Sequence, residues 1–371
     1  MKKVAYVLSS DPNDKRSWSG TCFSTYEQLK RHYDVDVYII KEDIIDKLWG
    51  IIIRNWMRIT RKCIAYKFTK FYTKRCGKKV EDALRGKKYD AAFFIGTFLL
   101  SDAKHLDIPK VLYYTDATFN NMLNYYAHGL SRLAQKQGDK IHKDAMTNAT
   151  HNLFASEWAI NSAINYYGIP AEKCHLARVG ANVDTSDFKK KLEEDTINLL
   201  FVGVEWVRKG GDIAVECIRY LTKTDKEHKY VLHLVGVRPP YDIPDENIKV
   251  YGFLNRNIPE QKQLMIELRE KANLFVLPTQ AECAGIVFGE SSAYGIPSIT
   301  FDTGGIGSYV TNGENGYRLP MGSKGKDFAE KIMEIVNDKE TLEYMQKRCK
   351  EIYKEKLNWD CLGDKIKSII G

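Results

Sequence analysis

The sequence lacks the signatures of several large protein classes. Its eight cysteines form no Cys-x-x-Cys pair and no zinc-like spacing with histidine, which favours a reducing cytosol over a disulfide scaffold or a zinc module. No apolar run approaches the ~20 residues of a membrane span, and Met1-Lys-Lys leads directly into a strand pattern without a signal-peptide core. We expect a cytoplasmic protein, with any membrane contact being peripheral and at the inner face of the cell membrane.

Motifs for nucleic acid and for metal are also missing. No zinc-finger, RNP-type or helix-turn-helix pattern is present, so nucleic acid is not an expected partner. The single Asp-x-Asp, Asp34-Val-Asp36, lies at the start of a β pattern, where we interpret it as turn and strand-entry chemistry. We therefore expect no metal ligands.

The chain is long enough for two domains, and its charge is uneven. It has 371 residues, of which 44% are hydrophobic, and ~100 to 200 residues per domain is usual. Residues 1–180 hold 29 Lys and Arg against 18 Asp and Glu, a net charge of +11, whereas residues 181–371 have a net charge of −3. The excess positive charge therefore belongs to the first half.

Short β-branched or aromatic runs alternate with helical patterns, which predicts parallel α/β layers. A polar, charged segment from Asp184 to Thr196 interrupts the alternation and predicts an interdomain linker. We expect a first Rossmann-like domain over 1–183, a second over 197–357, and a final helix over 358–371 that packs back on the first domain. The predicted strands cover 4–8, 35–40, 91–95, 111–114, 152–155, 175–179, 197–203, 230–235, 248–251, 273–277 and 297–301, with late helices near 326–337 and 340–356.

A glycine-containing turn, Gly203-Val-Glu-Trp-Val-Arg-Lys-Gly-Gly-Asp212, joins a predicted strand to a predicted helix. Glycines allow close backbone approach to a ligand, and a helix N-terminus favours an anion. Arg208 and Lys209 would add charge-assisted hydrogen bonds to phosphate oxygens. The turn is neither a Gly-x-Gly-x-x-Gly nor a Walker A loop, and a solvated Arg-Lys pair is the alternative.

Glu282 and Glu290 stand eight positions apart, between the apolar run that ends at Pro278 and the one that begins at Pro297. This arrangement places Glu282 in a loop at the carboxyl end of a strand and Glu290 on the following helix, where open α/β sheets bind ligands. Ionised carboxylates accept several hydrogen bonds and so suit hydroxyl-rich ligands. Two solvated surface acids are the alternative.

Taken in order, these elements resemble a known family. The Lys-Gly turn, Pro278-Thr-Gln-Ala-Glu282, the Glu-x7-Glu pair, Gly295-Ile-Pro297 and Asp302-Thr-Gly-Gly-Ile306 are similar to the GT-B glycosyltransferases of the family 4 type. The resemblance covers about Leu199 to Pro320, and the first half matches only loosely. It implies a GT-B fold, in which two Rossmann-like domains face a cleft.

The resemblance also implies an activity. Family members transfer a sugar from a nucleotide-diphosphate donor to an acceptor with retention of configuration, and they use no metal or other cofactor. Glu290 would then bind the ribose, Glu282 would lie beside the donor sugar, and Arg208 and Lys209 would stabilise the departing diphosphate. The remaining implied donor contacts are Gly203 and the backbone amides of Ala284, Gly285, Ile286 and Val287. Val204 is a departure, because many relatives carry an arginine after the glycine, and Arg208 is its expected substitute.

The first half offers three further candidates. Gly20 and Thr21 end a loop that follows the first strand and begin a helix, so they could contact the donor phosphates; an ordinary surface loop is the alternative. Asp116 follows another predicted strand and could orient the acceptor or take its proton. An N-cap of the next helix would explain Asp116 equally simply.

The segment from Leu48 to Lys88 is strongly basic. Arg54 to Lys88 carries 13 Lys and Arg against Glu81 and Asp82, interleaved with aromatic residues. A basic helix of this kind can lie on anionic lipid, and the alternative is a solvated helix whose apolar side is core.

We therefore expect a metal-independent retaining glycosyltransferase that acts on a glycan, lipid-linked or other hydroxyl acceptor, in cell-surface polysaccharide or glycolipid synthesis. A nucleotide-sugar epimerase of the same fold and a non-catalytic nucleotide- or glycan-binding subunit remain open alternatives. The sequence does not specify the sugar.

Overall fold

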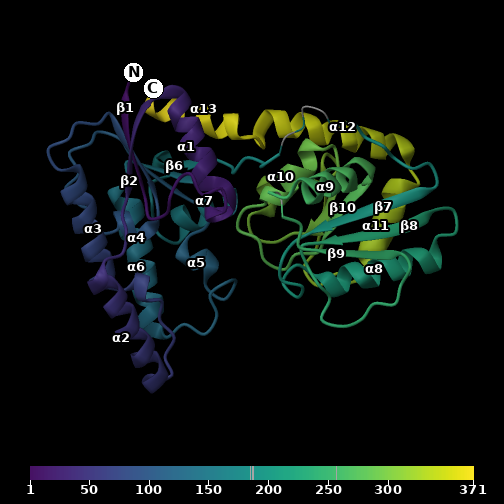
Figure 1. Ribbon diagram of the computed structural model, residues 1–371, viewed down its shortest axis with the longest axis horizontal. Helices are drawn as coiled ribbons and strands as arrows, with labels where there is room; N and C mark the ends of the chain where they lie inside the picture. Colours follow the sequence, from purple (N-terminus) through teal and green to yellow (C-terminus); the bar gives the residue numbers. More distant parts are fainter. Residues whose placement is uncertain (184, 186–187, 256) are drawn as a thin grey trace. The chain divides into compact units, whose positions relative to one another are not determined.

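The computed structural model describes residues 1–371 except 184, 186–187 and 256. It forms two units, the first made of Met1–Val179 with Trp359–Gly371 and the second of Gly180–Asn358 (Figure 1). Each unit contains a six-stranded parallel sheet with flanking helices. Among the described residues, no helix is long and apolar enough to cross a membrane.

The sheet of the first unit has the strand order β2-β1-β3-β4-β5-β6, with all neighbours parallel. Its central strands are fully buried, as expected for a parallel sheet covered on both faces. The order reverses direction between β1 and β3, so the loops that follow these strands diverge at that point. The strands are β1 (Lys3–Leu8), β2 (Asp34–Ile39), β3 (Ala91–Ile95), β4 (Val111–Thr115), β5 (His151–Phe154) and β6 (Cys174–Leu176).

The helices of the first unit fall into two packed groups. Helix α1 packs against α13, whereas α3, α4 and α6 pack against one another. The α-helices are α1 (Thr21–His32), α2 (Ile44–Thr60), α3 (Lys70–Leu84), α4 (Thr97–Leu100), α5 (Phe119–Met122), α6 (Arg132–Asn148), α7 (Glu157–Asn165) and α13 (Trp359–Ile370), with short 3-10 turns at Ser17–Gly20, Tyr66–Phe68 and Ala171–Lys173.

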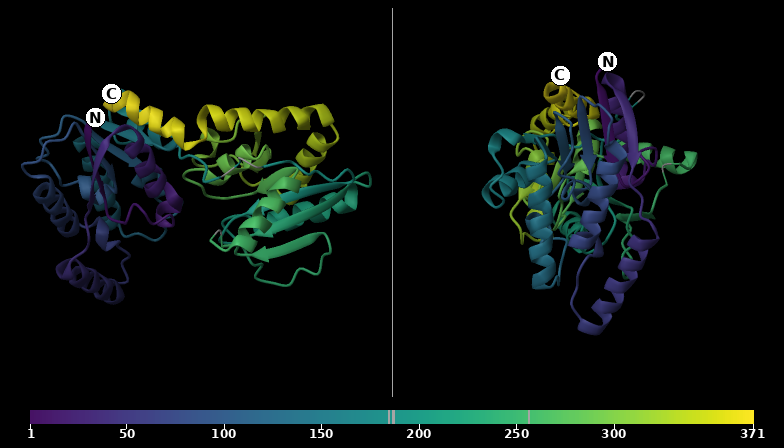
Figure 2. Two further views of the ribbon diagram at one scale, coloured as in Figure 1. Left: turned by 45° about the horizontal axis from the view of Figure 1, so that its top comes forward. Right: turned by 90° about the vertical axis from the view of Figure 1, so that its left-hand side faces the viewer.

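Helix α13 ties the C-terminus to the first unit. Gln28 of α1 donates a 2.9 Å hydrogen bond to the Asp360 carboxylate, and Lys2 Nζ donates to the Ile370 carbonyl at 2.7 Å. Both chain ends therefore lie together, as Figure 2 shows in two views. This is the packing predicted for the last helix.

The second unit has the strand order β12-β11-β10-β7-β8-β9, again with parallel neighbours. In chain order within the unit this is 6-5-4-1-2-3, the doubly wound Rossmann order. The order reverses between β7 and β10, which pair with Leu199 opposite Leu274. The strands are β7 (Thr196–Val202), β8 (Lys229–Val235), β9 (Ile248–Gly252), β10 (Leu274–Leu277), β11 (Ser298–Phe301) and β12 (Gly316–Leu319).

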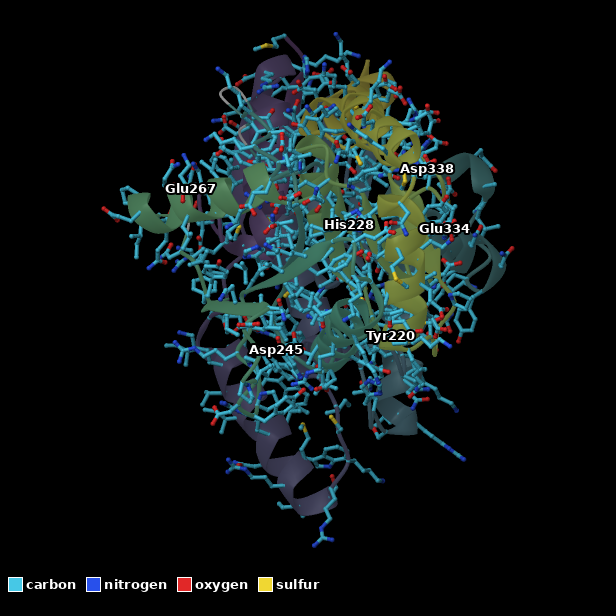
Figure 3. All side chains as sticks on the ribbon, turned by 90° about the vertical axis from the view of Figure 1, so that its right-hand side faces the viewer. Tyr220, His228, Asp245, Glu267, Glu334 and Asp338 are labelled. Carbon is cyan, nitrogen blue, oxygen red and sulfur yellow. The ribbon has the colours of Figure 1, made fainter. Side chains whose placement is uncertain are left out.

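The helices of this unit also form two groups, with α8 on α11 and α10 on α12. Exposed acids such as Glu267 and Glu334 lie on the surface of this net acidic half (Figure 3). The Asp338 carboxylate accepts a hydrogen bond from the Thr341 amide and so caps α12. The α-helices are α8 (Gly211–Thr224), α9 (Pro259–Lys271), α10 (Ile286–Ala293), α11 (Gly325–Val336) and α12 (Lys339–Lys356), and a 3-10 turn covers Ile306–Ser308.

Two details differ from the sequence expectations. Strand β12 was not predicted, because its four residues, Gly-Tyr-Arg-Leu, are too short and mixed to form a visible period. Of the predicted linker, residues 184 and 186–187 lie outside the described residues, and a later part packs onto the second unit. The Phe188 ring lies 4.6 Å from the Tyr294 ring, and Lys191 forms a 2.6 Å ion pair with Glu270. The described end of the predicted linker thus contacts the rest of the second unit, although the Lys191 side chain remains 68% exposed.

Candidate functional site

The turn between β7 and α8 is wound around Trp206. The indole nitrogen donates a 3.0 Å hydrogen bond to the Asp212 carboxylate, and the Gly211 amide donates to the Trp206 carbonyl at 2.9 Å. A Cβ on Gly211 would lie 2.3 Å from the indole ring, so only glycine fits there. The turn thereby acquires a fixed shape before α8 begins.

Gly210 brings this turn against the segment that follows β10. Its φ is +74°, and a Cβ at this position would lie 2.1 Å from the Pro278 carbonyl oxygen. The Arg208 carbonyl also accepts a 2.8 Å hydrogen bond from the Gln280 amide. The two segments meet at the carboxyl ends of β7 and β10, the point where the strand order reverses and where doubly wound sheets bind ligands.

Lys209 and Glu282 form an ion pair at this junction, although 73 positions separate them in sequence. Their side chains are only 9% and 15% exposed, so each charge has lost much of its hydration and depends on the other. The Gly305 amide donates to the Glu282 carbonyl at 2.9 Å, so the predicted Asp302-to-Ile306 motif holds the backbone of the Glu282 loop. The structure thus brings three predicted elements together.

Arg208 is held differently from Lys209. Its guanidinium donates to both carboxylate oxygens of Glu205, at 3.1 and 2.8 Å, and to the Ala281 carbonyl at 3.1 Å. The hydrogen bond from Arg208 lowers the pKa of the Glu205 carboxyl, more than burial raises it. A phosphate at Arg208 would therefore compete with Glu205, which is 64% exposed and can move into solvent.

The predicted amide cradle lies at the start of α10. Gly285 is the N-cap residue, and no side chain caps this end of the helix. Ala284, Ile286 and Val287 are half-buried around it. A Cβ on Gly285 would lie 2.7 Å from the Phe288 ring and 3.2 Å from the Tyr309 ring, so glycine allows the loop to pack under the helix. An uncapped helix start of this kind favours an anion.

Glu290 lies on α10, as predicted, but it is buried against a residue that the sequence analysis missed. Arg269 Nη2 lies 3.0 Å from Glu290 Oε2, and the two side chains are 8% and 7% exposed. The guanidinium also lies 4.7 Å from the centre of the Tyr294 ring. The sequence did contain a signal for Arg269. It lies four positions after Met265, so both side chains are on the buried face of α9, where a charged group needs a partner.

Gly203 lies at the start of the β7–α8 turn, where its Cα faces the Lys209 side chain. A Cβ there would lie 3.0 Å from Lys209 Cγ, so Gly203 leaves room for the lysine. Its carbonyl in turn packs against Gly236, whose Cβ would lie 2.2 Å from that oxygen. Gly203 therefore helps to set the position of the Lys209 side chain.

The candidates of the first unit are also joined to one another. Trp18, Ser19 and Gly20 all have positive φ, from +47° to +85°, and lead into α1 at the buried Thr21. The Trp18 indole donates a 3.2 Å hydrogen bond to the Asp116 carboxylate. The N-cap of α5 is Thr118, which accepts from the Asn121 amide, so the alternative role of Asp116 as a helix cap is wrong.

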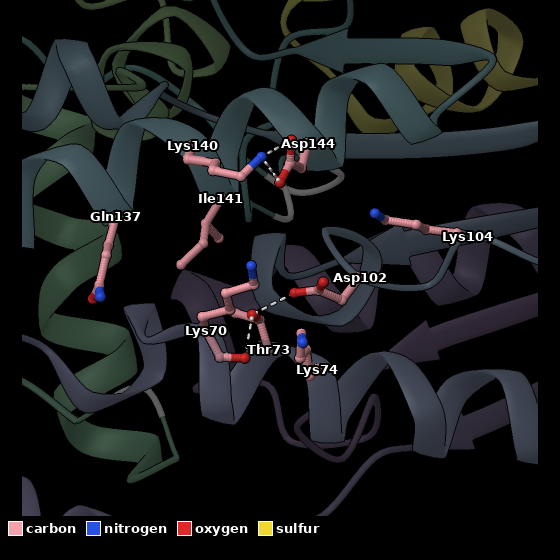
Figure 4. Close-up of a pocket in the computed structure, with 9 residues that line it drawn as sticks. All are labelled: Lys70, Thr73, Lys74, Asp102, Lys104, Gln137, Lys140, Ile141 and Asp144. Atoms are coloured by element: carbon pink, nitrogen blue, oxygen red, sulfur yellow. Dashed lines mark hydrogen bonds and ion pairs between the residues drawn. The ribbon is translucent and has the colours of Figure 1, made fainter.

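Two cavities lie away from these ion pairs. One, of about 370 Å³, is in the first unit between α3 and α6 and is lined by none of the predicted catalytic or donor-binding residues (Figure 4). Its lining residues are Lys70, Thr73, Lys74, Asp102, Lys104, Gln137, Lys140, Ile141 and Asp144. The other, of about 360 Å³, lies in the second unit beside Arg238, Tyr241 and Tyr251. Tyr241 donates to the Asp212 carboxylate and so connects this cavity to the β7–α8 turn.

Among the described residues, no group of three or more His, Cys, Asp or Glu side chains is placed to hold a metal ion. The cationic groups beside Glu282 are Lys209 and Arg208, which are suited to bind phosphate oxygens directly.

A large part of the second unit matches a known protein family. Residues 182–352, which include every predicted site residue of the second unit, match the family described as Glycosyl transferases group 1. An uncharacterized glycosyltransferase of Methanocaldococcus jannaschii is 27% identical over 169 residues, which are 43% of this chain and 44% of the relative. The N-acetyl-alpha-D-glucosaminyl L-malate synthase of Bacillus anthracis is 24% identical over 64% of this chain and 58% of its own. The chain thus spans about half the length of the curated relatives it matches.

Solved structures match over nearly the whole chain. A sucrose-phosphate synthase from Thermosynechococcus elongatus has a TM-score of 0.69 at 16% identity, covering 99% of this chain and 98% of its own. Anabaena HepE, in complex with UDP-glucose, has a TM-score of 0.64 at 14% identity, covering 99% of both chains. The chain has the GT-B fold, and residues 182–352 of its second unit are similar to the Glycosyl transferases group 1 family. The resemblance to GT-B glycosyltransferases inferred from the sequence motifs is confirmed.

Proposed function

We propose that the protein is a retaining, metal-independent glycosyltransferase of the family 4 type, which moves a sugar from a nucleotide-diphosphate donor to a hydroxyl acceptor. The match of residues 182–352 supports glycosyl transfer. A similar structure was solved with UDP-glucose, which favours a donor of this chemical class. No cofactor enters the proposal.

The observation that carries it is the Lys209–Glu282 ion pair at the strand-order reversal. In the proposed reaction, the bond between the anomeric carbon and the diphosphate oxygen breaks, and negative charge builds on the departing diphosphate. Lys209 and Arg208 would stabilise that charge, because cations fixed in a water-poor site interact strongly with it. Glu282 orients Lys209 and faces the sugar hydroxyls.

The anomeric configuration is retained when the acceptor attacks the anomeric carbon from the same face of the sugar ring that the diphosphate leaves. The acceptor oxygen then bonds to the anomeric carbon, and its proton passes to an oxygen of the diphosphate. Asp116 would orient the acceptor hydroxyl, with Trp18 fixing its carboxylate. Gly20 and Thr21, at the uncapped start of α1, would contribute backbone amides to the donor phosphates.

The remaining donor contacts would come from α10 and its surroundings. The amides from Ala284 to Val287 would bind the sugar and phosphate, and Glu290 would bind the ribose hydroxyls while keeping its bond to Arg269. The cavity beside Arg238 and Tyr241 is large enough to accept a nucleobase, which an aromatic ring and a guanidinium can stack against.

For the acceptor we propose a glycan or lipid-linked saccharide, and a role in cell-surface polysaccharide or glycolipid synthesis at the inner face of the cell membrane. This proposal is supported by the sequence similarity to a capsular polysaccharide biosynthesis glycosyltransferase of Staphylococcus aureus and by the shared fold of a lipopolysaccharide outer core galactosyltransferase. The basic segment 48–88 would provide the membrane contact.

The test is release of nucleoside diphosphate from a panel of nucleotide-sugars, with and without saccharide acceptors. Acceptor-dependent release that Lys209→Ala and Glu282→Ala abolish, with both variants still folded, is the expected result. Conversion of the donor without an acceptor would indicate an epimerase instead. Tight nucleotide binding without any turnover would indicate a binding subunit.

A further inference from the structure

Helix α2 presents an unusual number of large aliphatic side chains to solvent. Apolar side chains normally provide the buried stripe of a surface helix. Here six aliphatic residues lie outside the core, and the most exposed, Ile59, is 83% exposed. The six are Ile44 (76% exposed), Ile45 (50%), Leu48 (52%), Ile51 (45%), Ile52 (56%) and Ile59.

These residues share one face of the helix. At 3.6 residues per turn, Ile45, Leu48, Ile52 and Ile59 line one stripe, with Ile44 and Ile51 beside it. The opposite face is packed against the first unit, where Asp46, Gly50 and Ile53 are buried. Helix α2 therefore has two apolar sides, and the core uses only one of them.

A row of cations borders the outer stripe. Lys47, Arg54 and Arg58 follow one another at seven and four positions, which places them along one edge of the exposed apolar face. All three are exposed, and Arg61 and Lys62 continue the charge beyond the helix end. The outer face of α2 is therefore amphipathic. It consists of an aliphatic strip, formed by the exposed isoleucine and leucine side chains, and a basic margin, formed by Lys47, Arg54 and Arg58.

The acidic residues at α2 are paired with cations of α3. Asp43 caps the helix with a side chain that is 43% exposed, and Asp46, the only acid within the helix, is buried. Arg75 of α3 binds both carboxylates, at 2.5 and 2.8 Å. No carboxylate of α2 thus neutralises the basic margin, which leaves it available to an anionic surface.

The basic helix expected over 54–88 is two helices, and its aromatic residues mostly serve the fold. Tyr72 is buried, and Tyr66 donates a 2.8 Å hydrogen bond to Glu42. The Phe68 ring stacks on His142 at 5.8 Å. The expected lipid contact therefore does not come from these rings, and the exposed aliphatic residues of α2 are the ones free to make it.

We propose that the outer face of α2 docks on an anionic lipid surface. Its isoleucine and leucine side chains would enter the boundary between headgroups and acyl chains, while Lys47, Arg54 and Arg58 bind lipid phosphates. A second copy of the chain would fit less well, because the carboxylates at α2, Asp43 and Asp46, are already paired with Arg75 and Lys79 and do not meet a second basic margin. The inference deepens the proposed function by locating its membrane contact, and it does not depend on catalysis.

The test is co-sedimentation of the full chain with vesicles of phosphatidylglycerol and phosphatidylethanolamine, compared with phosphatidylcholine alone. Leu48→Gln/Ile52→Gln/Ile59→Gln keeps helix-forming residues and removes the centre of the strip. We expect it to weaken partitioning by about 100-fold or more, since burying one such side chain is worth about tenfold. The matched control replaces three exposed apolar residues elsewhere and should bind like the wild type: Leu133→Gln/Met321→Gln/Tyr344→Gln.

The contribution of the basic margin is tested with a second set of variants in the same co-sedimentation experiment. Lys47→Gln/Arg54→Gln/Arg58→Gln should abolish the preference for anionic vesicles, whereas Lys223→Gln/Lys326→Gln/Lys339→Gln should not. Equal binding by the aliphatic triple variant and the wild type, or no vesicle binding by the wild type, would overturn the proposal. A dimer in lipid-free solution that the aliphatic triple variant dissociates, without vesicle binding, would assign the face to a second copy.

The two proposals can fail separately. Nucleotide-induced thermal stabilisation, measured on the same α2 variants, reports on the second unit and should remain unchanged. Vesicle binding by a Lys209→Ala protein should likewise equal that of the wild type. A wild-type protein that binds vesicles but binds no nucleotide would therefore contradict the proposed function and leave the membrane proposal intact.

Discussion

Arg269 and Glu290 form a buried ion pair, with Nη2 of the arginine 3.0 Å from Oε2 of the glutamate. The pair links the end of α9 to α10 and lies beneath the face where we place the ribose. Buried ion pairs contribute little net stability, but breaking one by removing a single partner is costly. Stability and donor binding can therefore be separated at this site.

Arg269→Met should lower the free energy of unfolding by about 3 to 5 kcal/mol, because it removes the cation that pairs with the buried Glu290 carboxylate. Arg269→Met/Glu290→Met should recover most of that stability, since a well-packed apolar pair can replace a buried ion pair. The double variant should nevertheless lose nucleotide binding. Denaturation curves and nucleotide thermal shifts measure the two effects, and normal nucleotide binding by the double variant would exclude a ribose role for Glu290.

Lys209→Ala should reduce acceptor-dependent release of nucleoside diphosphate by about 100- to 1,000-fold, the usual loss when one stabilising group is removed from a developing anion. Steady-state kinetics on the best donor measures it. Lys223→Ala, an exposed lysine of α8, is the control for charge alone. Full activity of Lys209→Ala would rule out the phosphate role.

Gly210→Ala should be more damaging than an equivalent change at Gly313. Both glycines have positive φ, +74° and +76°, so alanine pays the same backbone strain at each. Only at Gly210 would the new Cβ meet backbone, 2.1 Å from the Pro278 oxygen, whereas the nearest atom to a Cβ at Gly313 is 3.8 Å away. We expect an extra loss of about 1 to 3 kcal/mol in unfolding free energy. Equal losses would show that the turn is not held against Pro278.

Asp116→Asn should lower the turnover number by about 100- to 10,000-fold, because the carboxylate orients the acceptor hydroxyl for transfer of its proton to the diphosphate, and the KM for donor should stay unchanged. Asparagine still accepts the hydrogen bond from Trp18, so the loop position is preserved. Trp18→Phe removes that bond and keeps the carboxylate, so it should raise the KM for acceptor more than it lowers turnover. A loss of donor binding in Asp116→Asn would contradict the acceptor-side role.

His233 should make the second unit acid-sensitive. Its Nε2 donates to Asn198 Oδ1 at 2.8 Å and its Nδ1 accepts from Tyr251 at 3.0 Å, and burial lowers its pKa to about 4. An unfolded histidine has a pKa of about 6.5. Between these values the unfolded state binds more protons, so stability falls as pH falls from about 6.5 to 4. Between pH 7 and 4.5 the free energy of unfolding should fall by about 2 kcal/mol less in His233→Gln than in the wild type, as measured by chemical denaturation. The same pH dependence of stability in the wild type and in His233→Gln would show that His233 does not cause the acid sensitivity.

Much of the fold was predictable because the signals are local. Buried parallel strands such as Ala91–Ile95 are continuous apolar runs, and alternation with amphipathic helices is typical of doubly wound sheets. Strand β12 was missed because four mixed residues carry no period. The alternative that Asp116 caps α5 was wrong, because the N-cap is Thr118. The two residues are only two positions apart, and the sequence alone does not choose between them.

The candidate site was predictable only in part. The glycine turn and the Glu282 loop were recognisable, since each follows a strand end where ligands bind. Their partners were not, because Arg269 lies 21 positions from Glu290 and Trp18 lies 98 positions from Asp116, and such pairings depend on how strands are ordered in the sheet. The exposed face of α2 was hidden for a related reason, because an aliphatic run looks like core until the packing is known.

The sequence by itself determined the parallel α/β class, the two-unit organisation, the glycosyltransferase resemblance and the loops that carry charged residues, since strand periods, glycine turns and motif order are written along the chain. Only the tertiary structure decided which charges meet. It paired Lys209 with Glu282 and Arg269 with Glu290, and it left the aliphatic side of α2 in solvent. The physical reason is that ion pairing and burial depend on distances in space, which the strand order sets and the local pattern does not contain.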